Sequence, residues 1–228
     1  MLHKCSRLVL GCSLLLVTAS VAQADVRGVG TIGPVTIDDT VVVPSNAICT
    51  LNGTVVKGNV LVRSGATLIT NGARIVGNVQ AFGAHVVDLR QQTLVEGDVQ
   101  GLGTRSIGVR GGTRVGGNVQ LTEGYAPTTV DALLVSGAVV TGNVQAEKSA
   151  GRLQVLQSQV GGNVQFVENR TGPYFIQNNV IRGDLQFFKN RGAGTITGNQ
   201  VGGNLQSKEN SPRPTVSNNW VAGNREVE

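Results

Sequence analysis

Val-Gly-Gly-Asn-Val-Gln, residues 160–165, decides the fold of this 228-residue chain, because variants of it recur down the sequence. The glycine that precedes the Asn or Asp recurs at steps of 19, 20, 20, 25, 20, 21, 20 and 20 residues. The nine glycines are Gly58, Gly77, Gly97, Gly117, Gly142, Gly162, Gly183, Gly203 and Gly223. A fixed period of this length is typical of a solenoid, in which each repeat contacts only its neighbours.

Apolar, mostly β-branched residues form three columns when the repeats are aligned on the glycine. Two positions before it stand Val56, Ile75, Val95, Val115, Val140, Val160, Ile181, Val201 and Val221. Two positions after it stand Val60, Val79, Val99, Val119, Val144, Val164, Leu185 and Leu205. Seven or eight positions before it stand Leu51, Ile69, Leu89, Val109, Val135, Val155, Ile176, Ile196 and Val216. With no helical periodicity between them, these columns predict three short strands per repeat.

The sequence therefore predicts an all-β fold, a single-stranded right-handed parallel β-helix of about nine coils. Each coil has about 20 residues and three short strands, and the right hand follows the usual handedness of parallel crossovers. The extra residues of the 25-residue step, around residues 123–129, are expected to bulge from a corner.

Polar columns follow the repeated glycine, which we expect to adopt positive φ at a sharp corner. The next position holds a predicted ladder: Asn59, Asn78, Asp98, Asn118, Asn143, Asn163, Asp184, Asn204 and Asn224. A second ladder follows two positions later: Gln80, Gln100, Gln120, Gln145, Gln165, Gln186 and Gln206. Because coils stack at about 4.8 Å, each amide is expected to donate to one neighbour and accept from the other.

The chain is divided as follows. Residues 1–24 read as a signal peptide, with a basic start, an apolar run and an Ala-Gln-Ala end, so we expect a protein exported to the periplasm or outside the cell. Residues 25–44 are expected to form an N-terminal cap, residues 45–221 the β-helix and residues 222–228 a charged C-terminal cap, with Trp220 at the end cap. Capped ends predict a monomer, since uncovered strand edges invite pairing.

Composition limits the classes of partner. Without Lys4 and Arg7 the chain keeps 19 − 2 = 17 basic and 14 acidic residues, a net charge of +3 that does not indicate nucleic acid. No later segment is apolar for long enough to predict a membrane span. Cys49 and His85 are the only cysteine and histidine after residue 24, and we expect Cys49 to be a buried core residue. No catalytic residue, cofactor or metal site is predicted.

The columns resemble the right-handed parallel β-helix of the pectate-lyase-like superfamily, including its asparagine ladder. The stretch from Asn52-Gly53-Thr54 through residues 65–68 to Gly77-Asn78-Val79 also resembles the bactofilins, bacterial β-helices that polymerise end to end. The first resemblance implies that an active enzyme would place acidic residues on adjacent coils. The second implies filaments, although bactofilins lack an export signal and have a shorter coil.

The acidic ladder members do not predict a catalytic pair. Asp98 and Asp184 stand four coils apart, about 19 Å along the axis, whereas paired glycosidase carboxylates stand roughly 5–9.5 Å apart. Both are therefore interpreted as ladder members.

The C-terminal coils carry the candidate ligand site. Six positions after the glycine the charge alternates: Lys148, Glu168, Lys189 and Glu209. We expect opposite charges on neighbouring coils to pair and fix register, and the next column, Ser149, Asn169, Asn190 and Asn210, to form another ladder. Beside them, Arg170, Tyr174, Phe188 and Arg191 are predicted to bind an acidic polysaccharide by stacking and guanidinium contacts. The competing interpretation is that Phe166, Phe187 and Tyr174 fill the core.

The expected function is that of a non-enzymatic exported β-helix with a structural or polysaccharide-binding role. Two alternatives stay open: a small polysaccharide lyase or glycoside hydrolase of the pectate-lyase-like superfamily, and a bactofilin-like filament protein.

Overall fold

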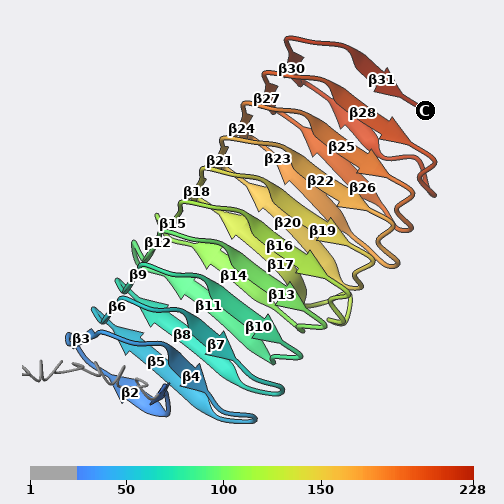
Figure 1. The fold of residues 1–228 in the computed structure, drawn as a ribbon. Coiled ribbons are helices and arrows are strands. Elements are labelled where there is room, and N and C mark those ends of the chain that lie inside the picture. Colours follow the sequence, from blue (N-terminus) through green and yellow to red (C-terminus); the bar gives the residue numbers. More distant parts are fainter. Residues whose placement is uncertain (1–24) are drawn as a thin grey trace, which may run out of the picture.

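The computed structural model describes residues 25–228 as a parallel β-solenoid without helices (Figure 1). Its coils stack along one axis, and three parallel sheets run the length of the stack. This confirms the predicted all-β fold with three short strands per coil. The predicted signal peptide, residues 1–24, lies outside the described residues. Within them, no helix combines the length and hydrophobicity needed to cross a bilayer.

Sheet A begins each coil and contains the Val-Gln motif. Its strands, in spatial order, are β1 (Val26–Arg27), β4 (Val41–Val43), β7 (Val60–Val62), β10 (Val79–Phe82), β13 (Val99–Leu102), β16 (Val119–Thr122), β19 (Val144–Glu147), β22 (Val164–Val167), β25 (Leu185–Phe188), β28 (Leu205–Lys208) and β31 (Arg225–Val227). Equivalent residues are direct partners, as in Val79 with Val99 and Gln80 with Gln100. The valines face the core and the glutamines face outward, because successive side chains of a strand point to opposite sides.

Sheet B follows sheet A around each coil. Its strands are β2 (Gly30–Ile32), β5 (Ile48–Asn52), β8 (Thr67–Asn71), β11 (Val86–Arg90), β14 (Ile107–Arg110), β17 (Asp131–Ser136), β20 (Arg152–Leu156), β23 (Tyr174–Gln177), β26 (Gly194–Thr197) and β29 (Thr215–Ser217). One predicted column member is wrong: Thr70, not Ile69, pairs with Leu51 and faces the core. The Thr70 hydroxyl is satisfied there by that of Thr93 at 2.8 Å.

Sheet C closes each coil with two-residue strands. They are β3 (Thr36–Ile37), β6 (Val55–Val56), β9 (Arg74–Ile75), β12 (Leu94–Val95), β15 (Arg114–Val115), β18 (Val139–Val140), β21 (Gln159–Val160), β24 (Val180–Ile181), β27 (Gln200–Val201) and β30 (Trp220–Val221). In each of these strands from β6 to β27 the second residue is buried. The Gly-Asn corner then leads back to sheet A, and we call it the C–A corner.

The solenoid has about ten coils, one more than predicted, and the segment predicted as the N-terminal cap supplies the additional coil. Residues 25–44 contribute β1, β2 and β3, which pair in register with β4, β5 and β6. They are therefore a further coil rather than a separate covering segment. With nine rises of about 4.8 Å, sheets B and C extend roughly 43 Å.

The expected C-terminal cap is also a continuation of the fold, since β31 is the last strand of sheet A. Arg225 occupies the inward position that Leu205 holds one coil earlier. Its Nη2 donates to the carbonyl oxygen of Val216 in sheet B at 3.1 Å, while Arg213 Nη2 donates to the carbonyl oxygen of Val227 at 2.7 Å. Arg213 and Arg225 thus tie the last turn of the solenoid together through hydrogen bonds to the backbone, and they place charge at its end.

The predicted bulge lies between β16 and β17, at the corner between sheets A and B, which we call the A–B corner. Residues 123–130 leave the regular path there, yet Gln120 and Gln145 on either side remain direct partners. The long step is therefore absorbed in a loop that leaves the register of sheet A unchanged, while in sheet B the pairing of β17 with β20 shifts between Asp131 and Leu133.

The core holds an aromatic cluster in its C-terminal half. Phe166, Tyr174 and Phe187 are buried, with ring centroids 5.7–6.4 Å apart. Gly194, the neighbour of Tyr174 in sheet B, leaves the space for Phe187: a Cβ there would lie 2.9 Å from the ring. Large and small residues on facing strands thus compensate for one another.

The predicted Asn ladder at the C–A corner is confirmed, but its main bond differs from the expected one. The side-chain Oδ1 of each member accepts the backbone N–H of the next member, as in Asp184 N to Asn163 Oδ1 at 2.7 Å. Amide-to-amide bonds occur at only some steps, for example Asn143 Nδ2 to Asn118 Oδ1 at 3.1 Å. The same backbone bond joins the whole row: Asn59, Asn78, Asp98, Asn118, Asn143, Asn163, Asp184, Asn204 and Asn224.

The repeated glycine is required for space, and the predicted positive φ is wrong. None of the nine corner glycines is among the positive-φ residues of the described chain. Instead, each glycine from the second of the nine onward packs over the ladder side chain of the preceding coil. A Cβ at Gly183 would lie 2.1 Å from Asn163 Oδ1. The glycine and the ladder residue therefore act together. Because glycine has no side chain, the ladder Oδ1 can reach the backbone N–H of the next coil.

Two further ladders run along the other corners with the opposite polarity. At the A–B corner the predicted column is confirmed: Asn169 N donates to Asn190 Oδ1 of the following coil at 3.1 Å, and Asn190 N donates to Asn210 Oδ1 at 2.9 Å. The sequence interpretation missed the third ladder, at the B–C corner, where Ser158, Asn179, Asn199 and Asn219 are linked in the same way. Most of these amides are buried, and their bonds satisfy corner N–H groups that no strand partner reaches.

Candidate functional site

The glutamine ladder lies on the outer face of sheet A, half-buried. Each amide donates from Nε2 to the Oε1 of the next coil, over distances of 2.5–3.5 Å from Gln80 to Gln206. These amides are therefore hydrogen-bonded to one another along the stack.

Ion pairs engage a part of the charged surface side chains. Ion pairs join Lys57 to Asp38, Arg74 to Glu96, Arg90 and Arg110 to Asp88, Lys148 to Glu147, Arg152 to Asp131 and Lys208 to Glu226. Hydrogen bonding to Glu147, followed by the attraction of its charge, raises the pKa of Lys148. The expected pairing along the alternating column is thus wrong for Lys148, which pairs within its own coil instead of with Glu168.

Three cations of the A–B corner have no such partner among the described residues: Arg170, Lys189 and Arg191 make neither an ion pair nor a side-chain hydrogen bond. With Glu168 and Asn169 they line an open depression of about 470 Å³. We call this surface the basic site.

Successive coils position the basic site. Arg170 N donates to the carbonyl oxygen of Ser149 and Arg191 N to that of Asn169, both at 2.8 Å, so the two arginines stand one rise apart. The buried Asn169 and Asn190 ladder fixes the backbone behind them. Glu168 and Lys189 just before it have φ of 55° and 54°, in the left-handed region that turns the chain at this corner.

The predicted ligand residues separate into a surface group and a core residue. Tyr174 is only 1 % exposed, and its hydroxyl donates to the carbonyl oxygen of Arg191 at 2.8 Å. Burial raises its pKa, so the phenol stays protonated as that donor. The expectation that Tyr174 stacks on a surface ligand is therefore wrong, because its ring packs in the aromatic cluster, as the competing interpretation held.

Phe188 lies at the edge of the basic site, on the outer face of β25. It is half-buried between its sheet partners Val167 and Lys208. Arg170, Arg191 and Phe188 therefore share one edge of the solenoid, and Lys189 joins them. Lys189 stands in the alternating charge column, but the sequence interpretation assigned that column to register and not to a ligand.

The acidic ladder members are tied into the fold. Asp98 Oδ1 accepts both the backbone N–H and the side-chain Nδ2 of Asn118, at 2.7 and 3.0 Å. Asp184 Oδ1 accepts the same two bonds from Asn204, at 2.7 and 3.2 Å. Across residues 25–228, no group of three or more His, Cys, Asp or Glu side chains is placed to hold a metal ion.

Cys49 is buried in the core, as expected, and desolvation raises the pKa of its thiol to about 11. A thiol in this state is protonated at neutral pH and unreactive, since the thiolate is the nucleophile.

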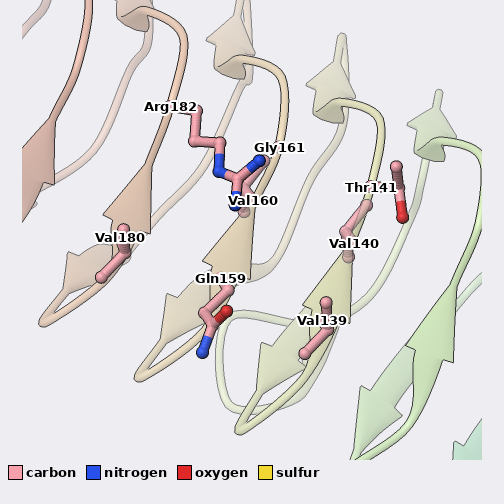
Figure 2. Close-up of a pocket in the computed structure, with 8 residues that line it drawn as sticks. All are labelled: Val139, Val140, Thr141, Gln159, Val160, Gly161, Val180 and Arg182. Carbon is pink, nitrogen blue, oxygen red and sulfur yellow. The ribbon is translucent and has the colours of Figure 1, made fainter.

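A second depression, of about 230 Å³, lies on the outer face of sheet C, on the side of the coil away from the A–B corner (Figure 2). Its outward side chains come from three successive coils and include Val139, Gln159, Val180 and Arg182. The sequence interpretation did not single out these residues. Their common signal is the repeat itself, because partners in β18, β21 and β24 recur at the coil period.

Comparisons of the chain with protein-family models, curated proteins and solved structures find no match.

Proposed function

We propose that this chain is an exported, non-enzymatic β-solenoid that acts as a structural element and binds an acidic polysaccharide at the basic site. Arg170, Lys189 and Arg191 contact carboxylates of the polymer, and Phe188 provides an apolar surface beside them. The main support for this proposal is that three cations of neighbouring coils, none of them in an ion pair or a side-chain hydrogen bond among the described residues, line one open depression.

The chemistry of the basic site favours a carboxylate-bearing chain. A guanidinium presents a planar set of donors that fits a carboxylate with two parallel hydrogen bonds. Arg170 and Arg191 stand about 4.8 Å apart along the axis, so a chain that carries acidic groups in sequence meets both. Glu168 accepts hydrogen bonds from sugar hydroxyls, and three cations against one anion leave a net charge of +2 in the depression.

Export and family membership are further parts of the proposal. The basic start, apolar run and Ala-Gln-Ala end of residues 1–24 support export. The parallel solenoid with asparagine ladders supports a relationship to the pectate-lyase-like superfamily, and the repeated Gly-Asn corners support the similarity to bactofilins.

Binding of oligogalacturonate, measured by isothermal titration calorimetry, tests the proposal. We expect the double variant Arg170→Gln/Arg191→Gln to lose at least tenfold in affinity, and binding by the wild type to weaken with added salt. The matched control is Arg63→Gln/Arg105→Gln, which removes the same charge from the A–B corner of earlier coils and should leave the affinity unchanged. Equal losses in both double variants, or no binding by the wild type, would contradict the basic site.

Product formation distinguishes the enzymatic alternative from the non-enzymatic proposal. The wild type is incubated with uronate and neutral glycans, with and without calcium, and new reducing ends or unsaturated products are measured. The proposal predicts no turnover. Turnover that a single acidic substitution abolishes would establish the lyase or hydrolase instead.

A further inference from the structure

The C-terminal half of sheet C presents an alternating row of outward-facing side chains, of which Val139 is half-buried and the others are exposed. Val139, Gln159, Val180, Gln200 and Trp220 are direct partners in successive strands from β18 to β30. Val180 is 44 % and Trp220 58 % exposed. Trp220, expected at the end cap, lies in the last strand of sheet C, with its indole on the outer face. Apolar side chains alternate here with amides, coil by coil, and we call this row the sheet C track.

A second row of residues, two of them glycines, runs beside the sheet C track on the same face. It contains Thr141, Gly161, Arg182 and Gly202, two positions further along each coil. Figure 2 shows the Arg182 side chain extending toward Gly161, beside the row of Val139, Gln159 and Val180. The backbone requires glycine at 161, since a Cβ would lie 2.2 Å from the carbonyl oxygen of Thr141. Gly161 thus packs tightly against the preceding coil, and together with Thr141 and Arg182 it lines the depression of about 230 Å³ beside the track.

The polar groups of the sheet C track are free to bind. Among the described residues, no side-chain hydrogen bond or ion pair engages Gln159, Gln200 or Arg182. The glutamines of sheet A, in contrast, are bonded to each other from coil to coil. The amides of Gln159 and Gln200 are therefore available to bond a ligand that lies on the track.

Charge selects the class of ligand. Within the two rows, from Val139 to Trp220, Arg182 is the only charged residue. The earlier coils of the same face carry ion pairs, such as Arg74 with Glu96 at 2.6 Å. The track thus offers aromatic, aliphatic and amide side chains with few ionic groups. Such a surface fits an uncharged partner.

We propose that the sheet C track binds a neutral, extended β-1,4-linked polysaccharide that lies along the solenoid axis. Like residues of the track recur every second coil, at about 9.6 Å. An extended β-1,4-linked chain has a comparable disaccharide repeat, because alternate sugars are turned over and present the same edge again. Gln159 and Gln200 then bond hydroxyls of alternate sugars, Val139 and Val180 contact the sugars' C–H faces, and Trp220 stacks on a terminal ring.

Titration with cellohexaose, followed by isothermal titration calorimetry and by Trp220 fluorescence, tests the inference. We expect Trp220→Ala and the double variant Gln159→Ala/Gln200→Ala each to lower the affinity at least tenfold. Arg74→Ala, in the same row but seven coils before Trp220 and thus about 34 Å from it, is the matched control and should leave the affinity unchanged. Maltohexaose, whose α-linkages curve the chain, should bind at least tenfold more weakly.

Four results would overturn the inference: no binding of cellohexaose, binding that the track variants leave unchanged, equal binding of maltohexaose, or a cellohexaose effect explained by dissociation of a dimer in light scattering. Circular dichroism of each variant verifies that it is folded, and Gln159→Glu provides a second variant that keeps the side-chain length. The basic site is tested separately with oligogalacturonate, so the failure of one proposal leaves the other standing. The sheet C track does not depend on the basic site, because the two lie on different faces.

Discussion

Replacing Asn163 by leucine removes one acceptor from the middle of the C–A ladder. The Asp184 N–H, which now donates to Asn163 Oδ1 at 2.7 Å, is left without a partner in a part-buried corner. An orphaned donor of this kind costs about 1–3 kcal/mol. For a domain of this size each kcal/mol shifts the melting temperature by about 2–4 °C, so we expect a fall of about 2–12 °C.

The matched control is Asn163→Asp, which keeps an oxygen where Oδ1 lies. Asp98 and Asp184 already hold this position and accept backbone N–H groups at 2.7 Å. Asn163→Asp should therefore melt close to the wild type. Thermal and urea unfolding followed by circular dichroism measure both variants.

The comparison distinguishes the two forms of ladder bonding. If the side-chain oxygen is the essential group, Asn163→Leu is destabilised and Asn163→Asp is not. An equal loss in both variants would refute this reasoning and favour amide-to-amide bonding. An unchanged melt for Asn163→Leu would show that the ladder contributes no measurable stability.

Three further predictions concern packing, burial and the end of the stack. Gly183→Ala places a Cβ 2.1 Å from Asn163 Oδ1 and should cost about 1–3 kcal/mol in urea unfolding, whereas Gly33→Ala, with no atom within 4 Å, should not destabilise. Cys49, with its pKa raised to about 11, should not react with a thiol reagent at pH 8 until the chain unfolds; above about pH 9 the unfolded thiol ionises first, so stability falls as the pH rises toward 11. Rapid labelling of the folded chain would contradict this burial. Arg225→Val replaces the inward charge of the last strand and should produce association that grows with concentration in light scattering, while the wild type stays monomeric; a monomeric variant would show that Arg225 does not guard this edge.

The columns of the sequence sufficed to predict the strands, the confirmed C–A and A–B ladders and the loop before β17. The B–C ladder was equally accessible, because Ser158, Asn179, Asn199 and Asn219 each stand four positions before a repeated glycine. The sequence interpretation assigned Asn columns to two corners and left this third column out. The spatial order of residues along a solenoid follows from the period alone, so this part of the fold can be predicted from the sequence.

Other features depend on the direction in which a side chain points, and the repeat period does not specify that direction. The reason for Gly183 lies in the path of Asn163 Oδ1 toward the next coil, which only the three-dimensional structure shows. Tyr174 was predicted on the surface with Arg170 and Arg191, but the strand alternation turns its ring inward, like that of its sheet partner Leu153. Whether Arg170 and Arg191 form ion pairs depends on which carboxylates lie within reach of them, and the spacing of residues in the sequence does not determine that.

The stacking of equivalent residues on adjacent coils is tested most directly by engineered disulfides. Gln145 and Gln165 are direct partners in β19 and β22, so their Cα atoms stand about 4.8 Å apart, within the usual disulfide range of about 4.4–6.8 Å. Gln145 and Gln186 are separated by two rises, about 9.6 Å, beyond that range. Oxidation of residues 25–228 carrying Gln145→Cys and Gln165→Cys should form the intramolecular bond, detected by mass spectrometry, and the Gln145→Cys/Gln186→Cys chain should not. The reverse result, or equal bond formation in both chains, would contradict the in-register stack.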